Sequence, residues 1–209
     1  MTVEVAKKAK SEGVNQFIFM SSIIVYGGAS KEKRIIDKNT IPKPTNFYGK
    51  SKLEAENGIK PLAKDDFKIA IIRPPMIYGK DSKGNYPKLA KAAQILPIFP
   101  DIDNERSMLH IDNLSEFLRL IIDNEDYGVF FPQNQEYVKT SELVQLIAEE
   151  HGKKICLVKI FNPILKAMFN KLDILIKVFG NLVYEKNLSI YKSDYQIRSL
   201  KESVKLTER

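Results

Sequence analysis

Two runs of consecutive apolar residues stand out along the chain. Residues 17–20 (FIFM) and residues 69–72 (IAII) are apolar at every position, which is typical of strands buried on both faces of a parallel sheet. Between them, residues 46–59 are predicted to form a helix that begins at Asn46. The order strand, helix, strand predicts a parallel α/β unit.

Further elements are predicted on both sides of this unit. Before it, apolar positions recur at helical spacing over residues 3–13, and Gly13 is the expected C-terminal stop. The polar, proline-bounded residues 31–44 are expected to form a surface loop. Beyond residue 79 we expect short elements: helices over 87–96, over 112–123 with Asp112 or Asn113 as cap, and over 140–150 with Thr140 as cap, and strands over 129–131 and 154–160.

The longest apolar stretch covers residues 160–184, and charged residues interrupt it at Lys166, Lys171, Asp173 and Lys177. These charges argue against a helix that spans a membrane. Two interpretations stay open. The one we favour is a helix packed over a substrate pocket, and the other is a basic amphipathic helix lying on a membrane surface.

Composition restricts the class of protein. With 209 residues and 44% hydrophobic content, the chain suits one soluble globular domain, or one domain with a small appendage. The net charge of +7 is scattered along the chain, which favours anionic small substrates over nucleic acid. The single cysteine, Cys156, and the two histidines argue against disulfide frameworks and metal sites. No apolar run follows the lysines of residues 1–13, so we expect no secretory signal and a cytoplasmic location.

Tyr48 and Lys52 stand one turn apart on the predicted helix. Removing a proton from a sugar hydroxyl while hydride leaves the same carbon needs a base that is ionised near neutral pH. A free phenol has a reference pKa of about 10, so its ionisation at pH 7 requires about 4 kcal/mol. An ammonium group about 4 Å away, at an effective dielectric near 20, supplies about this amount. We therefore expect Tyr48 to be the base and Lys52 to stabilise its phenolate.

A hydroxyl group is expected beside this pair. Ser22 follows the first buried strand, and parallel sheets bind ligands at the carboxyl ends of their strands. Ser22 is therefore predicted to hold the substrate oxygen, with Ser21 as the second choice. A Tyr-x-x-x-Lys match alone is expected about once by chance, and its ordinary meaning is an exposed helical pair. The order of strand, serines, helix and second strand argues for the catalytic interpretation.

Four motifs in order resemble the extended short-chain dehydrogenase/reductase family, and within it the NAD-dependent epimerase/dehydratases similar to UDP-glucose 4-epimerase: residues 20–27 (MSSIIVYG), 48–52 (YGKSK), 72–79 (IRPPMIYG) and 106–114 (RSMLHIDNL). The resemblance covers essentially the whole chain. It implies an incomplete Rossmann-like parallel sheet formed by residues 1–79, to which residues 105–132 return. Residues 80–104 and 133–209 would form a smaller C-terminal α/β substrate-binding part.

The resemblance also implies roles for individual residues. The catalytic residues would be Ser22, Tyr48 and Lys52. NAD would be held at its nicotinamide end by Lys52, with Tyr48 beside it, and lined by the backbone around Met20, Pro74 and Met76. A nucleotide-sugar substrate would place its diphosphate against Arg106, with Asn85 as a weaker candidate. Each residue also has an ordinary interpretation: Arg106 as a surface arginine, Asn85 as a turn residue, His110 as a buried structural histidine and His151 as a helix-end residue.

The reaction is narrowed by the residues after the catalytic serine. Dehydratases similar to this group carry an acid pair there, whereas this chain has Ile23 and Ile24, so dehydration is disfavoured. Epimerisation of a sugar hydroxyl is the first choice. A one-way reductase or dehydrogenase of the same family is the alternative, and a fold remnant without catalysis that binds a ligand or a protein is a third interpretation.

The family resemblance fails at one point. None of the ten glycines forms the Gly-x-x-Gly-x-x-Gly turn that binds the cofactor pyrophosphate in this family. We therefore expect a chain that lacks roughly the first third of the fold, and that is inactive or weakly active alone. A homodimer, or a separate N-terminal fragment that supplies the turn, is the expected partner, and the missing strands leave an open sheet edge.

Overall fold

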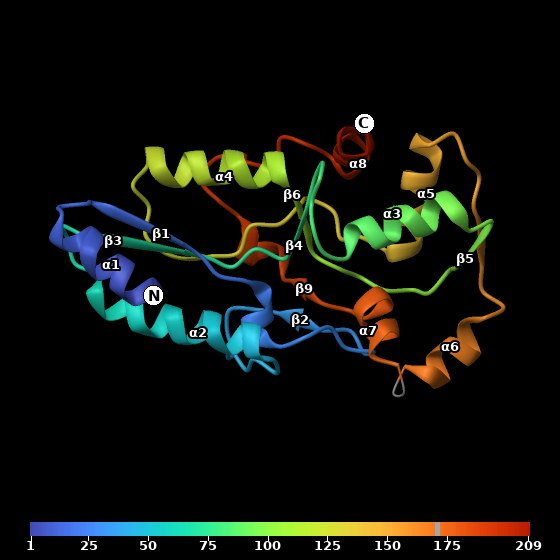
Figure 1. Ribbon diagram of the computed structural model, residues 1–209, viewed down its shortest axis with the longest axis horizontal. Helices are drawn as coiled ribbons and strands as arrows, with labels where there is room; N and C mark the ends of the chain where they lie inside the picture. Colours follow the sequence, from blue (N-terminus) through green and yellow to red (C-terminus); the bar gives the residue numbers. More distant parts are fainter. Residues whose placement is uncertain (170–171) are drawn as a thin grey trace.

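A three-stranded parallel sheet organises the first part of the molecule, which is known from a computed structural model that describes residues 1–169 and 172–209. The strands β1 (Gln16–Met20), β3 (Lys68–Ile72) and β7 (Gly128–Phe130) lie in the order β1-β3-β7. Phe19 is paired with Ile71 in the register of β1 and β3. The predicted parallel α/β unit is thereby confirmed (Figure 1).

Helices cover both faces of this sheet. On one face, Ile69 and Ile71 of β3 pack in a cluster with residues of α1 (Thr2–Ser11) and α2 (Phe47–Ile59). On the other face, Ala70 and Ile72 pack against α4 (Ile111–Asp123). Figure 1 shows α1 and α2 on one side of the strands and α4 on the other. Successive side chains of a strand point to opposite faces, so a strand buried on both sides is apolar at every position.

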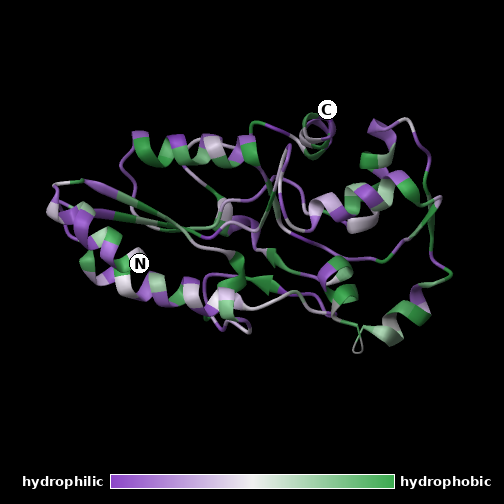
Figure 2. Ribbon diagram, in the orientation of Figure 1, coloured by the Kyte–Doolittle hydropathy of each residue, from purple (hydrophilic) through white to green (hydrophobic). Residues whose placement is uncertain are grey.

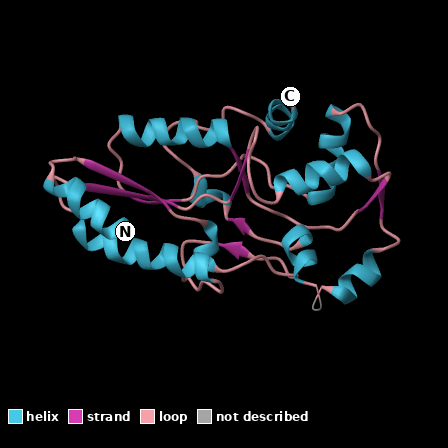
Figure 3. Ribbon diagram, in the orientation of Figure 1, coloured by secondary structure: helices cyan, strands magenta, loops and turns pink. Residues whose placement is uncertain are grey.

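The C-terminal part has a separate core. The helices α3 (Tyr86–Ile95) and α5 (Thr140–Glu150) pack together, and β5 (Ile98–Pro100) pairs in parallel with β8 (Cys156–Val158) (Figure 3). The remaining elements are short: η1 (Ile23–Tyr26), β2 (Ile35–Ile36), η2 (Lys60–Leu62), β4 (Met76–Tyr78), β6 (Met108–His110), α6 (Asn162–Met168), α7 (Asp173–Phe179), β9 (Val183–Tyr184), η3 (Lys186–Ser189) and α8 (Leu200–Glu208).

Two predicted helix caps are wrong. The cap of α4 is His110, whose Nδ1 accepts a hydrogen bond from the Asp112 backbone N–H at 3.2 Å. Asp112 instead lies in the first turn, where a carboxylate favours the helix dipole. Thr140 is the first residue of α5 rather than its cap. Its backbone N–H donates to the Asn104 side chain at 3.1 Å, a partner 36 residues earlier that no local pattern identifies.

Two predicted segments differ in detail. The expected surface loop over residues 31–44 contains the short strand β2, in which Ile36 is fully buried and pairs with Tyr184 of β9. The apolar stretch over residues 160–184 forms two short helices, α6 and α7, instead of one helix. Lys171, one of its interrupting charges, lies outside the described residues.

Candidate active site

A cavity of about 430 Å³ opens at the carboxyl ends of β1 and β3. Five of the predicted site residues line it: Ser22, Tyr48, Met76, Asn85 and Arg106. The cavity wall contains two cationic side chains, Lys83 and Arg106, and none of the lining residues is an aspartate or glutamate. The electrostatic character of this cavity therefore favours an anionic ligand.

Ser22 enters the cavity because the chain turns sharply after β1. It caps η1, and its Oγ accepts a hydrogen bond from the Ile24 backbone N–H at 3.3 Å. The ends of the two strands are held together at this point, since the Ile23 N–H donates to the Pro74 carbonyl at 2.9 Å. Ser21 faces the other way and donates to a carboxylate oxygen of buried Glu56 at 2.5 Å. The structure thus places Ser22 in the cavity wall and Ser21 in the core.

Tyr48 and Lys52 lie on the first turns of α2. Asn46 caps this helix as predicted, and its side chain accepts from the Gly49 N–H at 2.8 Å. The Lys52 Nζ lies 5.7 Å from the centre of the Tyr48 ring and donates to the Met20 carbonyl oxygen at 2.8 Å. Tyr48 is 53% exposed, so its phenol is accessible from the cavity. The two side chains therefore lie together beside the end of β1.

Gly49 allows α2 to approach η1 closely. A Cβ atom at this position would lie 2.7 Å from the Ile24 carbonyl oxygen and 2.9 Å from the Pro44 Cβ. Ile24 follows Ser22 by two residues, so this contact sets the separation between the serine and the tyrosine. A residue with any side chain at position 49 would push the two apart.

A buried ionic network that none of the sequence patterns above predicted lies directly behind these residues. Glu56, fully buried on α2, accepts hydrogen bonds from the Arg73 guanidinium, with a distance of 2.9 Å from Nε. Arg73 Nη1 in turn donates to the Tyr26 hydroxyl at 2.6 Å. Burial disfavours ionisation of Glu56, but the hydrogen bonds from Arg73 and Ser21 outweigh it, so the pKa of this carboxyl lies below its ordinary value. The network ties α2 to the ends of β1 and β3.

A signal for this network was present in the sequence. Glu56 follows Lys52 by four residues and Tyr48 by eight, so the three side chains share one face of α2. Arg73 directly follows four apolar residues of a buried strand. A charged residue at each of these positions needs a partner of opposite sign when it is buried.

Arg106 lines the cavity at the point where the chain returns from residues 80–104, beside the C-terminal part. Its backbone pairs with Val138, and its Nη1 donates to the Lys177 carbonyl oxygen at 2.6 Å. Burial lowers the pKa of the guanidinium from its ordinary value. None of the ion pairs found within residues 1–169 and 172–209 includes Arg106. A cationic group in a cavity wall with no carboxylate partner there is suited to an anionic ligand.

A second, apolar hollow of about 150 Å³ continues from the first and shares three residues with it: Met76, Asn85 and Arg106. Its wall is formed by side chains of α3, α5 and α7, which include Leu89, Leu143 and Val178. The apolar stretch is predicted to form a helix packed over a substrate pocket; α7 lines this hollow, and its use by a substrate stays a prediction. Asn85 begins α3 without a side-chain capping hydrogen bond.

Only some of the residues predicted to line the nicotinamide lie in the wall of the cavity. Met76 lines the cavity, as does Pro75, whereas Met20 and Pro74 are absent from its wall. The carbonyl oxygens of Met20 and Pro74 accept hydrogen bonds from Lys52 and from the backbone of Ile23. The nicotinamide end of a dinucleotide therefore fits the residues present, through Tyr48 and Lys52. The pyrophosphate end has no glycine-rich turn within the 209 residues.

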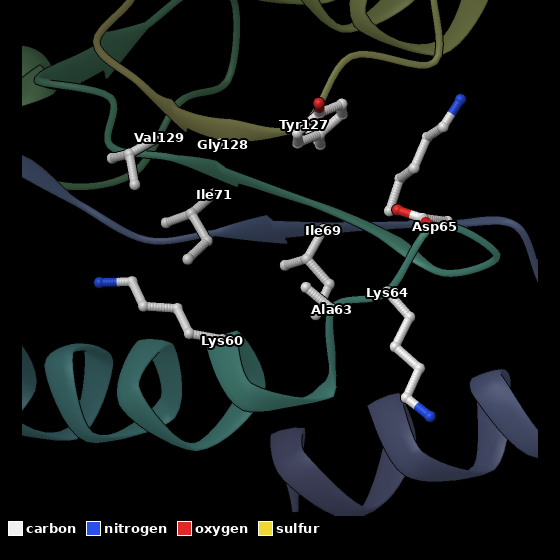
Figure 4. Close-up of a pocket in the computed structure, with 10 residues that line it drawn as sticks. Lys60, Ala63, Lys64, Asp65, Ile69, Ile71, Tyr127, Gly128 and Val129 are labelled. Atoms are coloured by element: carbon white, nitrogen blue, oxygen red, sulfur yellow. The ribbon is translucent and has the colours of Figure 1, made fainter.

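A larger cavity, of about 560 Å³, lies elsewhere, between η2 and β7 on the α2 side of the sheet (Figure 4). Its floor is apolar and includes Ile69, Ile71 and Val129. Figure 4 shows the amines of Lys60 and Lys64 pointing in different directions. Because its polar groups do not converge, this cavity has no arrangement that resembles the site at the strand ends.

Comparisons with known proteins identify the family. A profile of the NAD dependent epimerase/dehydratase family matches residues 1–131. The chain is 32% identical to a UDP-glucose 4-epimerase of Vibrio cholerae over 194 residues, 87% of this chain and 58% of that protein. It is 30% identical to an N-acetyl-alpha-D-glucosaminyl-diphospho-ditrans,octacis-undecaprenol 4-epimerase of Escherichia coli O157:H7, over 86% of this chain and 55% of that protein. The chain belongs to the NAD-dependent epimerase/dehydratase family.

Solved structures support the same fold. The structure of UDP-glucuronic acid 4-epimerase from Bacillus cereus in complex with NAD matches 99% of this chain with a TM-score of 0.74 and 16% identity, over 64% of its own chain. RMD from Pseudomonas aeruginosa complexed with NADPH matches with a TM-score of 0.71 and 21% identity, over 99% of this chain and 70% of its own. The Rossmann-like α/β class is thereby confirmed. The chain spans a little over half the length of the curated relatives named above.

No helix among the described residues is long and apolar enough to cross a membrane. Within the same residues, no group of three or more histidine, cysteine, aspartate or glutamate side chains is arranged to hold a metal ion.

Proposed function

We propose that the chain carries the catalytic and substrate-binding residues of an NAD-dependent epimerase that acts on sugars joined to a diphosphate, with nucleotide sugars as the first choice. The observation that carries this proposal is the single cavity lined by Ser22, Tyr48 and Arg106, with Lys52 directly behind the tyrosine. The contact of Arg106 with the C-terminal part supports it, since the backbone of Arg106 pairs with Val138 and Leu182 while its side chain reaches the cavity of Tyr48.

The proposed chemistry uses the residues as follows. The Tyr48 phenolate accepts the proton of a sugar hydroxyl, and the positive charge of Lys52 favours the phenolate. The Ser22 hydroxyl donates a hydrogen bond to the same substrate oxygen. Bound NAD supplies a hydride acceptor and donor for the sugar carbon. After the keto sugar has turned its other face, Tyr48 returns the proton to the oxygen.

The cavity also supports epimerisation over dehydration. Removal of water from the sugar needs an acid beside the leaving hydroxyl, and no aspartate or glutamate lines the cavity. Arg106 is proposed to hold the substrate diphosphate, because its planar guanidinium matches phosphate oxygens and no carboxylate of the described residues pairs with it. The diphosphate would then lie at the junction of the polar cavity and the apolar hollow.

Binding of NAD is proposed to require a phosphate-binding segment from outside these 209 residues. The nicotinamide end has Tyr48 and Lys52, whereas no glycine-rich turn is present for the pyrophosphate. The free edge of β1, which pairs only with β3 within the described part of the chain, is a site at which such a segment can add strands. The segment would come from the same polypeptide or from a complementing fragment.

Titration calorimetry and an epimerase assay test the proposal together. The chain is assayed with NAD and a panel of nucleotide sugars, alone and with the N-terminal segment of the Vibrio cholerae relative. We expect turnover with the segment, and a loss of about 10²- to 10⁴-fold on Tyr48→Phe. Tyr127→Phe is the matched control, because Tyr127 is 71% exposed and does not line the catalytic cavity. Sub-millimolar NAD binding by the chain alone would refute the need for the segment, and full turnover by Tyr48→Phe would refute the proposed base.

A reductase is the second candidate. The chain is 28% identical to a GDP-6-deoxy-D-mannose reductase of Pseudomonas aeruginosa, over 71% of this chain and 53% of that protein. The same tyrosine, lysine and serine would serve one-way reduction of a keto sugar. An assay of cofactor consumption distinguishes a reductase from an epimerase. A reductase uses one reduced cofactor for each product molecule, whereas epimerisation returns the cofactor to its starting state.

A further inference from the structure

The helix α6 is apolar on the side that faces solvent as well as on the side that faces the core. On the inner side, Leu165 and Phe169 pack in the core of the C-terminal part. On the outer side, Ile164 is 62% exposed, and Ile160, two residues before the helix begins, is 78% exposed. Figure 2 shows mostly hydrophobic colouring along this helix. A surface helix normally carries polar residues on its outer side, so these outer residues indicate a surface that something else covers.

This exposed apolar surface, called here the α6 surface, has five members: Ile160, Phe161, Ile164, Met168 and Leu172. Ile164 and Met168 are four residues apart within α6, so they share one side of the helix, and Ile160 lies in the turn just before it. All five are at least 37% exposed. They lie within 13 residues, whereas the exposed hydrophobic residues elsewhere on the described molecule occur singly or in smaller groups such as Ile95, Leu96 and Ile98.

The charge around the α6 surface identifies the kind of partner. Residues 153–177 contain six lysines and one aspartate, so this stretch accounts for five of the seven net positive charges of the chain. Lys154, Lys159 and Lys177 are exposed in the structure. Apolar side chains interspersed with lysines along the chain match the interface of a bilayer, where the apolar groups enter the headgroup region and the lysines attract anionic lipids.

From these observations we propose that the α6 surface docks the protein on membranes that contain anionic phospholipids. The five apolar side chains would lie at the boundary between headgroups and acyl chains, and the exposed lysines would lie over the phosphates. This docking is peripheral and needs no spanning helix. It extends beyond the proposed epimerase activity and does not depend on it, because binding to vesicles requires neither cofactor nor substrate.

The position of the surface agrees with docking. The α6 surface and the free edge of β1 lie at opposite ends of the molecule (Figure 1), so strands added to that edge would leave α6 uncovered. The next helix, α7, contributes Lys177 and Val178 to the wall of the hollow beside Arg106. A docked molecule would therefore hold the proposed diphosphate site close to the membrane surface.

Sedimentation with lipid vesicles tests the proposal on the purified chain. We expect it to pellet with vesicles of phosphatidylglycerol and phosphatidylethanolamine, to stay in solution with phosphatidylcholine vesicles, and to be released by high salt. The double variant Ile160→Ser with Ile164→Ser should lower the partition coefficient at least about tenfold. The matched control, Ile41→Ser with Ile190→Ser, changes two isoleucines that are 81% and 75% exposed elsewhere and should leave binding unchanged.

Two results would overturn the proposal. One is a vesicle experiment in which the wild-type chain does not bind the anionic vesicles or both double variants bind them equally. The other is sedimentation velocity that shows a dimer which Ile160→Ser with Ile164→Ser converts to a monomer, without vesicle binding by either, because a second copy of the chain would then cover the α6 surface. Thermal unfolding of both double variants checks that they fold.

Discussion

The parallel sheet and the C-terminal part of the chain bury their apolar residues to different degrees. In β3, Ile69, Ile71 and Ile72 are each no more than 5% exposed, because helices pack on both faces of the strand. In α6, residues as apolar as these face solvent, with Ile164 at 62%. The same residue type thus supports folding in one region and is available for binding in the other. An apolar run in the sequence does not by itself distinguish these two uses.

The largest expected effect comes from the ionic network in the sheet region. Glu56→Ala leaves the Arg73 guanidinium, whose side chain is 6% exposed, without its carboxylate. We expect a loss of about 3–5 kcal/mol in the free energy of unfolding, measured by urea denaturation. Glu116→Ala removes one partner of an ion pair with Arg119, which is 56% exposed, and should cost less than about 1 kcal/mol. Equal losses in the two variants would show that the network does not stabilise the fold.

Substitution of isoleucine in each region tests the comparison directly. Ile72→Ala removes a side chain that is fully buried between the sheet and α4, and we expect a loss of about 2–5 kcal/mol. Ile164→Ala, at a residue that is 62% exposed, should change stability by less than about 0.5 kcal/mol. A large loss at Ile164 would mean that the α6 surface is part of the folded core of the protein in solution, and would contradict its availability for binding.

The sequence could predict the elements that depend on local patterns, but not the contacts between distant segments. The strands β1 and β3 and the helix α2 follow from local patterns: continuous apolar runs, and a capping asparagine at Asn46. The pairing of β5 with β8 joins residues 98–100 to residues 156–158, and nothing in either short segment identifies the other. The His110 cap was missed because histidine is an uncommon capping residue, and its ring nitrogen serves here.

The candidate site also contains contacts that the sequence predicts and contacts that it does not. Tyr48 and Lys52 are one turn apart on a single helix, so their proximity follows from the sequence alone. The approach of Arg106 to the same cavity requires the chain to return from residues 80–104, and only the family resemblance indicated it. The contact between Glu56 and Arg73 depends on the packing of α2 on β3, which no spacing rule predicts. The roles of Tyr48 and Lys52 in catalysis, and of Arg106 in substrate binding, remain predictions.

A smaller effect is expected from the close contact between α2 and η1. In an exposed helix, Gly→Ala would stabilise by about 1 kcal/mol. At Gly49 the added Cβ would lie 2.7 Å from the backbone oxygen of Ile24, so we expect Gly49→Ala to destabilise by about 1–3 kcal/mol. At Gly58 of the same helix, the closest atom is the Val3 side chain, which can move, so Gly58→Ala should cost less. Thermal unfolding compares the two, and a stabilised Gly49→Ala would show that the contact is looser than described.

The pH dependence of stability gives the smallest and most specific test of the sheet region. Glu56 has a lowered pKa in the folded protein, because the hydrogen bonds from Arg73 and Ser21 outweigh the effect of burial. An acid whose pKa is lowered by folding stabilises the protein above its unfolded pKa, here about 4.3, and loses this contribution as pH falls toward the folded value. Urea denaturation between pH 6 and the onset of acid unfolding should therefore show a steeper loss for the wild type than for Glu56→Gln. If the free energy of unfolding fell with pH equally in the two proteins, Glu56 would bind no extra proton on unfolding. The ionic network would then not be what holds α2 against the strand ends.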